Sequence, residues 1–413
     1  MASTHDLAAL NAVGKELYDG QKIAEMFLFK NPALALIEKK TDTTGEVYPI
    51  PVIVSGPQGT SNTFANALAN SHAAVTRRFN LTRGKVHGVQ VIDRETMLAI
   101  RGSKGAFKDA VKLAVDAAVK SIRNTISVQF WGTGTGRLGQ FASGGISTGV
   151  VTLADASTAR RFDIGMKCTV GTTDGTVEAG TGAGFVIKVD EAAGTVTFAQ
   201  TQGGSAANPT NWNAGSYPKH IMLDGCENAA IKGIPGWIPD AAVSLTDNWF
   251  GVNRSEHSRL AGILYDGTGV SVREALITLA SKICAAGGDA DPTHCFVNQS
   301  SYLALDNELA GKAEYQTLEG TAKLKFKGIK LPTENGEVTV LPDRSVPSLR
   351  AWMLSMNTWK LYSILDVPHV QNDEGLDMFT RDPNSDGYQV RFAAYCNPGC
   401  NAPGYNGVAT LSA

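Results

Sequence analysis

The sequence predicts an α+β fold that carries an inserted small antiparallel β-barrel. Three observations support this prediction: a long amphipathic helix pattern after Gly105, short alternating apolar runs over residues 150–223, and a strand-rich last quarter of the chain. Because a strand-rich end follows a helical middle, the pattern indicates the α+β class. The 413 residues exceed what one hydrophobic core organises, so roughly two to four domains are expected.

Composition excludes several classes of protein. The formal net charge is −2, which argues against general coating of nucleic acid or binding to an anionic membrane surface. The first 20 residues show neither a basic segment nor an apolar core of a signal peptide, so we expect the chain to stay where it is made, without a membrane. Six scattered cysteines are too few for a disulfide scaffold and suit a reducing cytoplasm.

The N-terminal part predicts two protruding segments. Residues 1–40 hold a short amphipathic stretch that is too small to be a domain, so we interpret them as an arm that packs on something else. Residues 41–80 combine an apolar run with a loop rich in Gly, Ser, Thr and Asn. Pro49 and Pro51 lack the N–H groups of a sheet ladder, which favours an edge strand or a protruding hairpin over a central strand.

The strongest helical pattern lies within residues 81–135. Its apolar stripe recurs at i, i+3 and i+4 and comprises Phe107, Val111, Ala114, Val115, Ala118, Ile122 and Ile126. The basic residues gather on the opposite side: Lys104, Lys108, Lys112, Lys120 and Arg123. Two interpretations stay open, a solvated face or a stripe that contacts phosphate or an acidic partner. Lys104, Lys108 and Lys112 are the candidate DNA-facing residues.

A glycine-rich stretch, WGTGTGRLGQFASGGISTG, follows this helix. Gly134, Gly136 and Gly139 match the dinucleotide-binding pattern G-x-G-x-x-G, but seven glycines in residues 132–149 produce such a match by composition alone. A dinucleotide loop must also follow a strand and open a helix, whereas here a helix precedes and a β-patterned segment follows. We therefore interpret the stretch as a hinge between the helix and the inserted domain, made by Gly132, Gly134, Gly136 and Gly139.

The same stretch contains a second catalytic pattern. Gly145, Ser147 and Gly149 spell G-x-S-x-G, the nucleophile elbow of hydrolases. That elbow needs a helix directly after the serine, but Ser147 leads into the strand-like run VVTL. The sequence therefore predicts no catalytic serine here.

The rest of the chain divides into three parts. Residues 136–225 hold period-two runs separated by turns and predict the inserted β-domain. Residues 226–340 contain the best-specified helix, SVREALITLASKICAAGG, where Ser271 and Glu274 form a capping box. Residues 341–413 predict strands, among them one long alternating strand AWMLSMNTWKLYSIL.

Other candidate sites have structural explanations. Residues 382–387, DPNSDG, match the first half of an EF-hand loop, but position twelve is Ala393 where a bidentate Glu belongs, so a β-turn explains them better. Cys396 and Cys400 have no second pair at zinc spacing. His294 and Cys295 precede an apolar run and fit a buried core pair better than a catalytic dyad. No catalytic residue, cofactor site or metal site is predicted.

The order of these parts resembles the major capsid proteins of tailed bacteriophages, which share the Hong Kong ninety-seven fold. GEVYPIPVIVSGPQGTSNTF resembles the family's E-loop, and AFKDAVKLAVDAAVKSIRNTISVQFWGTG resembles its spine helix. VSVREALITLASKICAAGGDADPTHCFVNQSSYLALDNEL is similar to the axial helix, strand and helix. GLDMFTRDPNSDGYQVRFAAYCNPGCNAPG is similar to the closing strands of the peripheral domain.

The resemblance implies a domain layout. The expected parts are an N-terminal arm (1–40), an E-loop (41–80), a peripheral domain with the spine helix (81–135), an inserted β-domain (136–225), an axial domain (226–340) and a return to the peripheral domain (341–413).

The resemblance also implies a structural function. The chain would form the pentamers and hexamers of an icosahedral shell around double-stranded DNA, in a virion made in the cytoplasm of a bacterial host. The family's long N-terminal scaffolding region is absent, which implies a separate scaffolding protein, or one removed from the mature chain. A portal is a further implied partner, and whether a decoration protein sits on the inserted domain stays open. The hairpin tip VSGPQGTSN has no lysine, so we expect noncovalent interlocking instead of the crosslinks that some members form.

Three alternatives stay open. The same fold builds encapsulin nanocompartments, whose cargo is protein, so the nucleic-acid content of purified particles separates the two. An enzyme that uses residues 132–149 would lose activity in Ser147→Ala and Gly136→Ala, whereas a shell subunit would assemble as before. A β-rich binding module would bind glycan through residues 140–225 alone.

Overall fold

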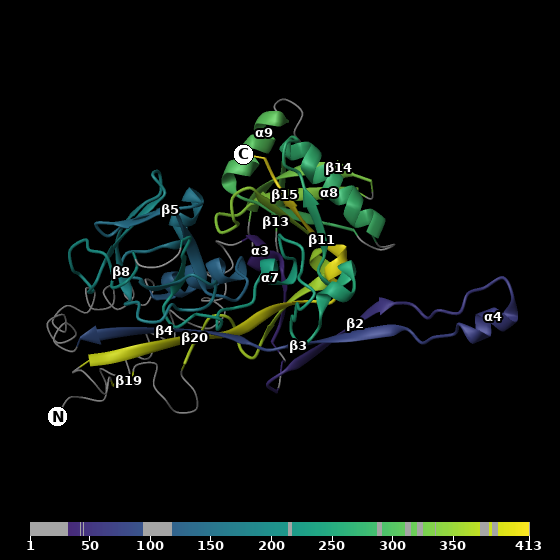
Figure 1. Ribbon diagram of the computed structural model, residues 1–413, viewed down its shortest axis with the longest axis horizontal. Helices are drawn as coiled ribbons and strands as arrows, with labels where there is room; N and C mark the ends of the chain where they lie inside the picture. Colours follow the sequence, from purple (N-terminus) through teal and green to yellow (C-terminus); the bar gives the residue numbers. More distant parts are fainter. Residues whose placement is uncertain are drawn as a thin grey trace.

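The computed structural model describes residues 32–41, 43, 45–93, 118–213, 217–286, 291–309, 315–319, 325–334, 336–371, 380–381 and 387–412. Lys104, Lys108 and Lys112, residues 382–386 and the arm up to residue 31 lie outside this part of the chain. Two open sheets, a closed barrel and a separate two-stranded hairpin make up the described architecture (Figure 1). The hairpin projects to one side, and the barrel lies on the other (Figure 1).

The first sheet has six strands and packs on a helix. Its members are β1 (Glu38–Lys40), β17 (Trp359–Ser363), β20 (Gly387–Cys400), β18 (His369–Val370), β19 (Thr380–Arg381) and β4 (Gly84–Asp93). The helix covers residues 118–130 in the described part and is called the core helix below. Gly88 of β4 lies so close to it that a Cβ there would clash with Cδ1 of Ile122. The long strand pair β4–β20 and the core helix therefore build one layered unit, which includes Val119, Ile122, Ile126 and Phe130 in its apolar core.

The second sheet has seven strands in the order β11, β21, β16, β12, β15, β14, β13. Their bounds are Ile263–Asp266, Gly407–Thr410, Arg350–Leu354, His294–Val297, Gly336–Pro342, Lys325–Thr333 and Tyr315–Glu319. Two helices pack on it, α8 (Val272–Ala286) and α9 (Gln299–Glu308). None of the described helices combines the length and the apolar character needed to cross a membrane.

Two side chains, Ser271 and Glu308, cap the start of α8. Oγ of Ser271 accepts a hydrogen bond from N of Glu274 at 3.2 Å, as the pattern predicts. The carboxylate of Glu308, at the end of α9, accepts from the backbone N of Val272 and of Arg273, each at 3.0 Å. A side chain distant in sequence therefore satisfies free N–H groups of this helix and ties the two helices together.

The inserted domain is a closed barrel in the order β10-β5-β6-β9-β8-β7. Its strands are β5 (Arg137–Ser147), β6 (Val150–Leu153), β7 (Lys167–Gly171), β8 (Gly184–Asp190), β9 (Thr195–Ala199) and β10 (His220–Leu223). Large aromatic side chains fill its own apolar core, among them Phe141, Phe162, Phe198 and Trp212. The predicted α+β class with an inserted antiparallel barrel is thus confirmed.

One strand prediction is wrong. The run AWMLSMNTWKLYSIL forms two strands in different sheets, because the turn η5 (Met356–Thr358) interrupts it. Asn406 stabilises the change of direction: its Oδ1 accepts from N of Ser355 at 2.9 Å and from Nε1 of Trp359 at 2.8 Å. Residues 341–413, expected to return to the peripheral domain, contribute β17 and β20 to the six-stranded sheet and β16 and β21 to the seven-stranded sheet, and the domain bounds stay a prediction. Alternation predicts a strand but not the sheet it joins.

The remaining helical elements are short. They are α3 (Pro32–Leu36), α4 (Phe64–Ala69), α7 (Ile234–Trp237), η2 (Ala156–Arg161), η3 (Arg254–Glu256), η4 (Ser258–Leu260) and η6 (Pro403–Tyr405). Ala33 and Leu34 of α3 are buried in the same core as the core helix. The described end of the expected N-terminal arm therefore packs on its own chain.

Candidate assembly surface

The projecting hairpin consists of β2 (Tyr48–Ser55) and β3 (Val75–Leu81), which pair only with each other among the described strands. Their register runs from Tyr48↔Leu81 to Ile53↔Thr76 and shifts before Ser55. Pro49 and Pro51 therefore lie in a two-stranded sheet, which agrees with the expected protruding hairpin. An isolated two-stranded hairpin is marginally stable in water, so its form must depend on what holds its base and on what covers its tip.

Buried apolar side chains anchor the base of the hairpin. Ile50, Val54, Phe79 and Leu81 are all buried. The ring of Phe79 lies 5.0 Å from the ring of Trp237 in an edge-on arrangement. These contacts attach one end of the hairpin to the core of the subunit.

The tip of the hairpin exposes large apolar side chains. It carries the short helix α4, in which no residue is buried. Phe64 is 84% exposed and Leu68 is 67% exposed, and their i, i+4 spacing places them on one side of the helix. Two backbone hydrogen bonds of 3.0 Å between Gln58 and His72 close the loop below this helix. The tip thus presents two uncovered apolar side chains on a closed loop far from the core.

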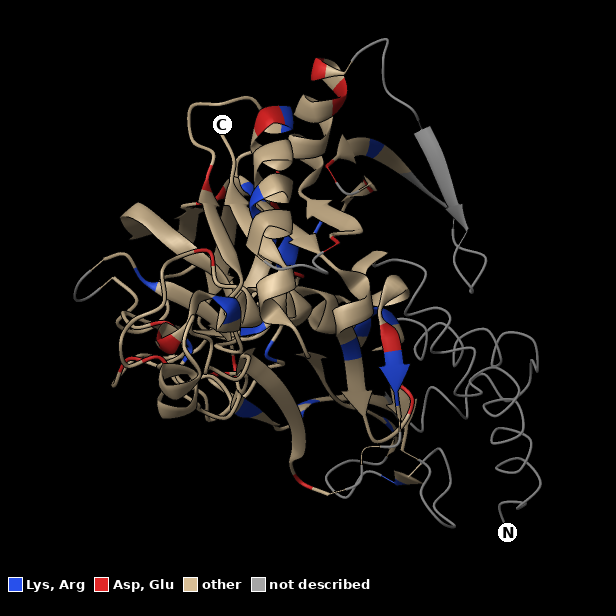
Figure 2. Cartoon of the chain, turned by 90° about the vertical axis from the view of Figure 1, so that its right-hand side faces the viewer, with Lys and Arg blue, Asp and Glu red and all other residues tan. Residues whose placement is uncertain are grey.

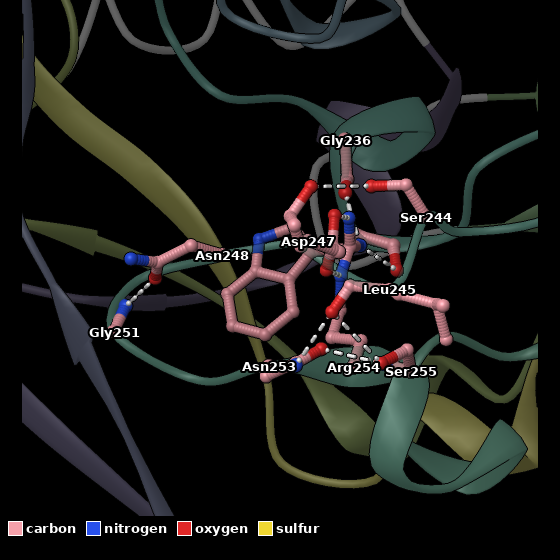
Figure 3. Close-up of polar contacts among 11 residues, drawn as sticks. Gly236, Ser244, Leu245, Asp247, Asn248, Gly251, Asn253, Arg254 and Ser255 are labelled. Atoms are coloured by element: carbon pink, nitrogen blue, oxygen red, sulfur yellow. Dashed lines mark hydrogen bonds and ion pairs between the residues drawn. The ribbon is translucent and has the colours of Figure 1, made fainter.

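A second loop, residues 244–256, is held together by polar contacts around Arg254 (Figure 3). Nε and Nη2 of Arg254 bind the two carboxylate oxygens of Asp247 at 2.7 and 2.9 Å. Nη1 of Arg254 donates to the backbone oxygens of Gly236 at 2.6 Å and of Trp237 at 3.1 Å. Hydrogen bonding and the charge of this guanidinium hold the pKa of Asp247 below its usual value. Only 4% of Arg254 is exposed, so these bonds are shielded from water.

The braced loop connects to the hairpin through a salt bridge and a backbone hydrogen bond. Nη2 of Arg77 on β3 lies 2.7 Å from Oε2 of Glu256, with both side chains partly exposed. N of Asn80 donates to the backbone oxygen of Phe250 at 2.9 Å. Sequence patterns did not single out Arg254, because the carbonyl groups it binds come together only in the folded chain.

The four glycines proposed as a hinge have different conformations. Gly134 and Gly136 have φ of +94° and +78°, while Gly132 and Gly139 do not fall in the left-handed region. Gly136 also packs closely, because a Cβ there would lie 2.5 Å from the backbone oxygen of Cys226. The hinge role of the four residues stays a prediction. At Gly136 the close packing against Cys226 requires glycine whether or not the residue is a hinge.

Gly136→Ala is expected to destabilise the chain by roughly 2 to 4 kcal/mol, because it combines a left-handed φ with a steric clash. This changes the test suggested by the sequence, where the substitution was expected to be silent. Gly144→Ala is the matched control, since a Cβ there meets nothing within 4 Å. The midpoint of urea unfolding measures both variants, and equal midpoints would contradict the expected clash.

The structure explains the G-x-S-x-G pattern as a turn. Ser147 ends β5, Thr148 and Gly149 have positive φ, and β6 begins at Val150. A helix does not follow the serine, as the sequence indicated. Among the described residues, no group of three or more His, Cys, Asp or Glu side chains is placed to hold a metal ion.

His294 and Cys295 lie next to each other on β12 in environments that oppose a catalytic dyad. Burial raises the pKa of the Cys295 thiol and lowers that of the His294 imidazole to about 4. Nδ1 of His294 lies 2.9 Å from Oγ1 of Thr293. A neutral thiol beside a neutral imidazole is the reverse of the activated pair that nucleophilic catalysis requires.

The lowered pKa of His294 predicts that the folded chain loses stability in acid. This pKa is lower in the folded chain than the value of about 6.5 expected after unfolding, so the unfolded state binds more protons as the pH falls. Lowering the pH from 7 to 4.5 should therefore reduce the free energy of unfolding by about 2 to 3 kcal/mol. This reduction should disappear in His294→Gln. Urea unfolding at both pH values measures the difference. His72→Gln is the control, because His72 is exposed on the hairpin, and it should lose as much stability in acid as the parent. If His294→Gln loses the same amount as these two proteins, the prediction is wrong.

Charges of both signs are interspersed over the described elements (Figure 2). The proposed DNA-facing lysines lie outside the described residues, and Lys120 is the next member of that stripe. Lys120 is exposed on the core helix, while Arg123 is half-buried. The stripe therefore stays a prediction.

Comparison with known proteins identifies the fold. No protein-family model and no curated protein matches this sequence. The capsid asymmetric unit of cyanophage A-1(L) is similar in structure, with a TM-score of 0.51 at 9% identity over 92% of this chain and 93% of that one. The capsid of a native GTA particle matches at a TM-score of 0.46, with 8% identity over 92% of this chain and 90% of that one. The holo-SrpI encapsulin complex of Synechococcus elongatus PCC 7942 matches at 0.43, with 8% identity over 91% and 85%. The chain has the Hong Kong ninety-seven fold of phage capsid proteins, extended by an inserted six-stranded barrel.

Proposed function

We propose that this chain is the major capsid protein of a tailed bacteriophage and that copies of it build a closed shell. The observation that carries the proposal is the hairpin tip, where Phe64 and Leu68 are exposed on a segment that the subunit itself does not cover. Large apolar side chains grouped in this way mark a surface that another molecule buries. The capsid fold supports a second copy of the chain as that molecule.

The assembly follows from repetition of this contact. A hairpin that covers a different surface of the next subunit makes a heterologous contact, and rotation closes such contacts into rings. The proposed rings are pentamers and hexamers of an icosahedral shell that encloses double-stranded DNA without sequence specificity. The proposed location is the virion, after synthesis in the cytoplasm of a bacterial host. The work of the chain is structural in this proposal, without catalysis or a cofactor.

A separate scaffolding protein and a portal complete the proposal. Both come from the family resemblance, and a decoration protein on the barrel is the further candidate partner. Pentamers and hexamers can join into shells of different sizes, so a scaffolding protein would select one size. The effect of a scaffold is therefore a measurable part of the proposal.

Electron microscopy of the expressed full chain, alone and together with the proposed scaffolding protein, tests the proposal. The expected result is closed particles with five-fold and six-fold capsomers. Nuclease-protected double-stranded DNA in particles from infected cells supports the phage assignment, whereas protein cargo without DNA would assign a nanocompartment instead. A compact monomer under all these conditions would overturn both assignments.

We expect the interlocked subunits to be joined without covalent bonds. The tip between Val54 and Asn62 has no lysine, and Nζ of Lys40, below the hairpin, already donates to the Tyr48 hydroxyl at 2.6 Å. Boiled particles on a denaturing gel should therefore run as one monomer band. A ladder of higher bands would show crosslinks and contradict the expectation.

A further inference from the structure

A short segment after β15, residues 343–348, lies where the barrel, the core helix and the seven-stranded sheet meet. We call it the joint segment. It bonds to the barrel through three of its residues. Nη2 of Arg344 donates to the backbone oxygen of Arg160 at 3.2 Å. Oγ of Ser348 donates to Oδ2 of Asp155 at 2.6 Å, and Nη2 of Arg161 donates to the backbone oxygen of Ser345 at 3.1 Å. Asp155 and Arg161 flank one turn of the barrel, η2, so this turn is held at both ends.

The joint segment also binds the other two parts of the fold. Nε1 of Trp131, which follows the core helix, donates to Oδ2 of Asp343 at 3.0 Å. Oγ of Ser127 on that helix lies 2.9 Å from Oγ of Ser345. Nδ2 of Asn298, at the start of α9, donates to the backbone oxygen of Val346 at 2.8 Å. The segment is thus fixed to the subunit body and offers its remaining groups to the barrel.

Apolar contact contributes little to this attachment. Among the described buried residues, the apolar cluster of the barrel includes Val128 of the core helix but no residue of the seven-stranded sheet. The groups at the joint are instead polar or charged, and Asp343 and Arg161 are both buried. Burial raises the pKa of the Asp343 carboxyl to about 6 and lowers that of the Arg161 guanidinium to about 10, so both charges are held at a cost.

We propose that Asp155 and Arg161, together with the joint segment, form a releasable latch that holds the barrel on the seven-stranded-sheet unit. Polar domain contacts of this kind favour relative motion, because water replaces their hydrogen bonds when they open. Gly134 and Gly136 lie in one of the two chain connections, before β5 and after β10, that remain intact when the latch is open. The barrel then turns about these connections, whereas the closed latch holds it in one orientation. This inference concerns the single chain and does not depend on the proposed shell.

The variant Arg161→Met/Ser348→Ala weakens the latch, because it removes two of the three side-chain donors between the joint segment and the barrel and leaves that of Arg344. Hydrogen exchange followed by mass spectrometry on the unassembled full chain reads the result. Exchange is expected to rise about tenfold or more in residues 132–139 and 154–166, and to stay unchanged in β8, β9 and α8. Lys188→Met/Ser147→Ala is the matched control, since both residues are exposed on the barrel.

Each outcome decides the proposal. Exchange equal to that of the control would show that these contacts do not hold the barrel. Exchange that rises equally in β8 and β9 would show that the barrel unfolds and does not undock, which also overturns the proposal. Ser348→Ala alone is the milder variant for the case in which the double variant fails to fold. It should raise exchange in the same two segments by a smaller factor, and no rise there would count against the latch.

Discussion

Replacing Phe64 and Leu68 together by serine is expected to abolish particle assembly and leave the subunit folded. Both side chains are exposed on α4, and no residue of this helix is buried within the subunit. The folded chain therefore loses no packing, and the unfolding free energy should change by less than about 0.5 kcal/mol. Burial of these side chains in a neighbour contributes roughly 3 to 6 kcal/mol per contact, which is a factor of about 10² to 10⁴ in association. Because a shell repeats the contact in every subunit, the loss is multiplied.

Electron microscopy and sedimentation of the purified variant measure this loss. Ile164→Ser is the matched control, because it removes an apolar side chain that is 74% exposed on the barrel instead of on the hairpin. The control should assemble as the parent does. Normal particles from the Phe64/Leu68 variant would show that the tip is not the contact between copies and would remove the main support for the proposed function.

Arg254→Ala is expected to lower the free energy of unfolding by about 3 to 5 kcal/mol. The substitution leaves Asp247 without its bidentate partner and leaves the backbone oxygens of Gly236 and Trp237 without a donor. It also removes the guanidinium from the face of the Trp249 ring, whose centroid lies 5.0 Å away. Unsatisfied groups in a shielded site cost more than the same groups in water. Urea unfolding of the unassembled chain measures the change.

Arg77→Ala is the matched control for this prediction. It removes another arginine–carboxylate pair at the base of the same hairpin, but Arg77 and Glu256 are both partly exposed. An exposed pair of this kind contributes at most about 1 kcal/mol. Similar losses in the two variants would contradict the difference that burial is expected to make.

Periodicity located most elements of the fold. The alternating runs within residues 150–223 became the strands of the barrel, and the stripe that contains Leu276 and Leu279 became the buried side of α8. Pro49 and Pro51 indicated an edge strand or a protruding hairpin, and among the described strands β2 and β3 pair only with each other. These predictions succeeded because they depend on local properties, namely which side of an element is apolar and which residues lack a donor.

The candidate site was less accessible from sequence. The hairpin was predicted, but its exposed helix α4 and the brace around Arg254 were not. Arg254 acts through backbone oxygens of residues 236–237 and a carboxylate at Asp247, so its role depends on how three segments meet. The division of residues 350–363 between two sheets depends in the same way on Asn406, which lies far along the chain.

The sequence by itself determined the α+β class and the presence of an inserted β-barrel, because these follow from periodicity and local spacing. Only the tertiary structure decided which sheet each C-terminal strand joins, which glycine packs against Cys226 and how the joint segment holds the barrel. The physical reason is that hydrogen bonds and close packing between residues distant in sequence leave no periodic trace along the chain.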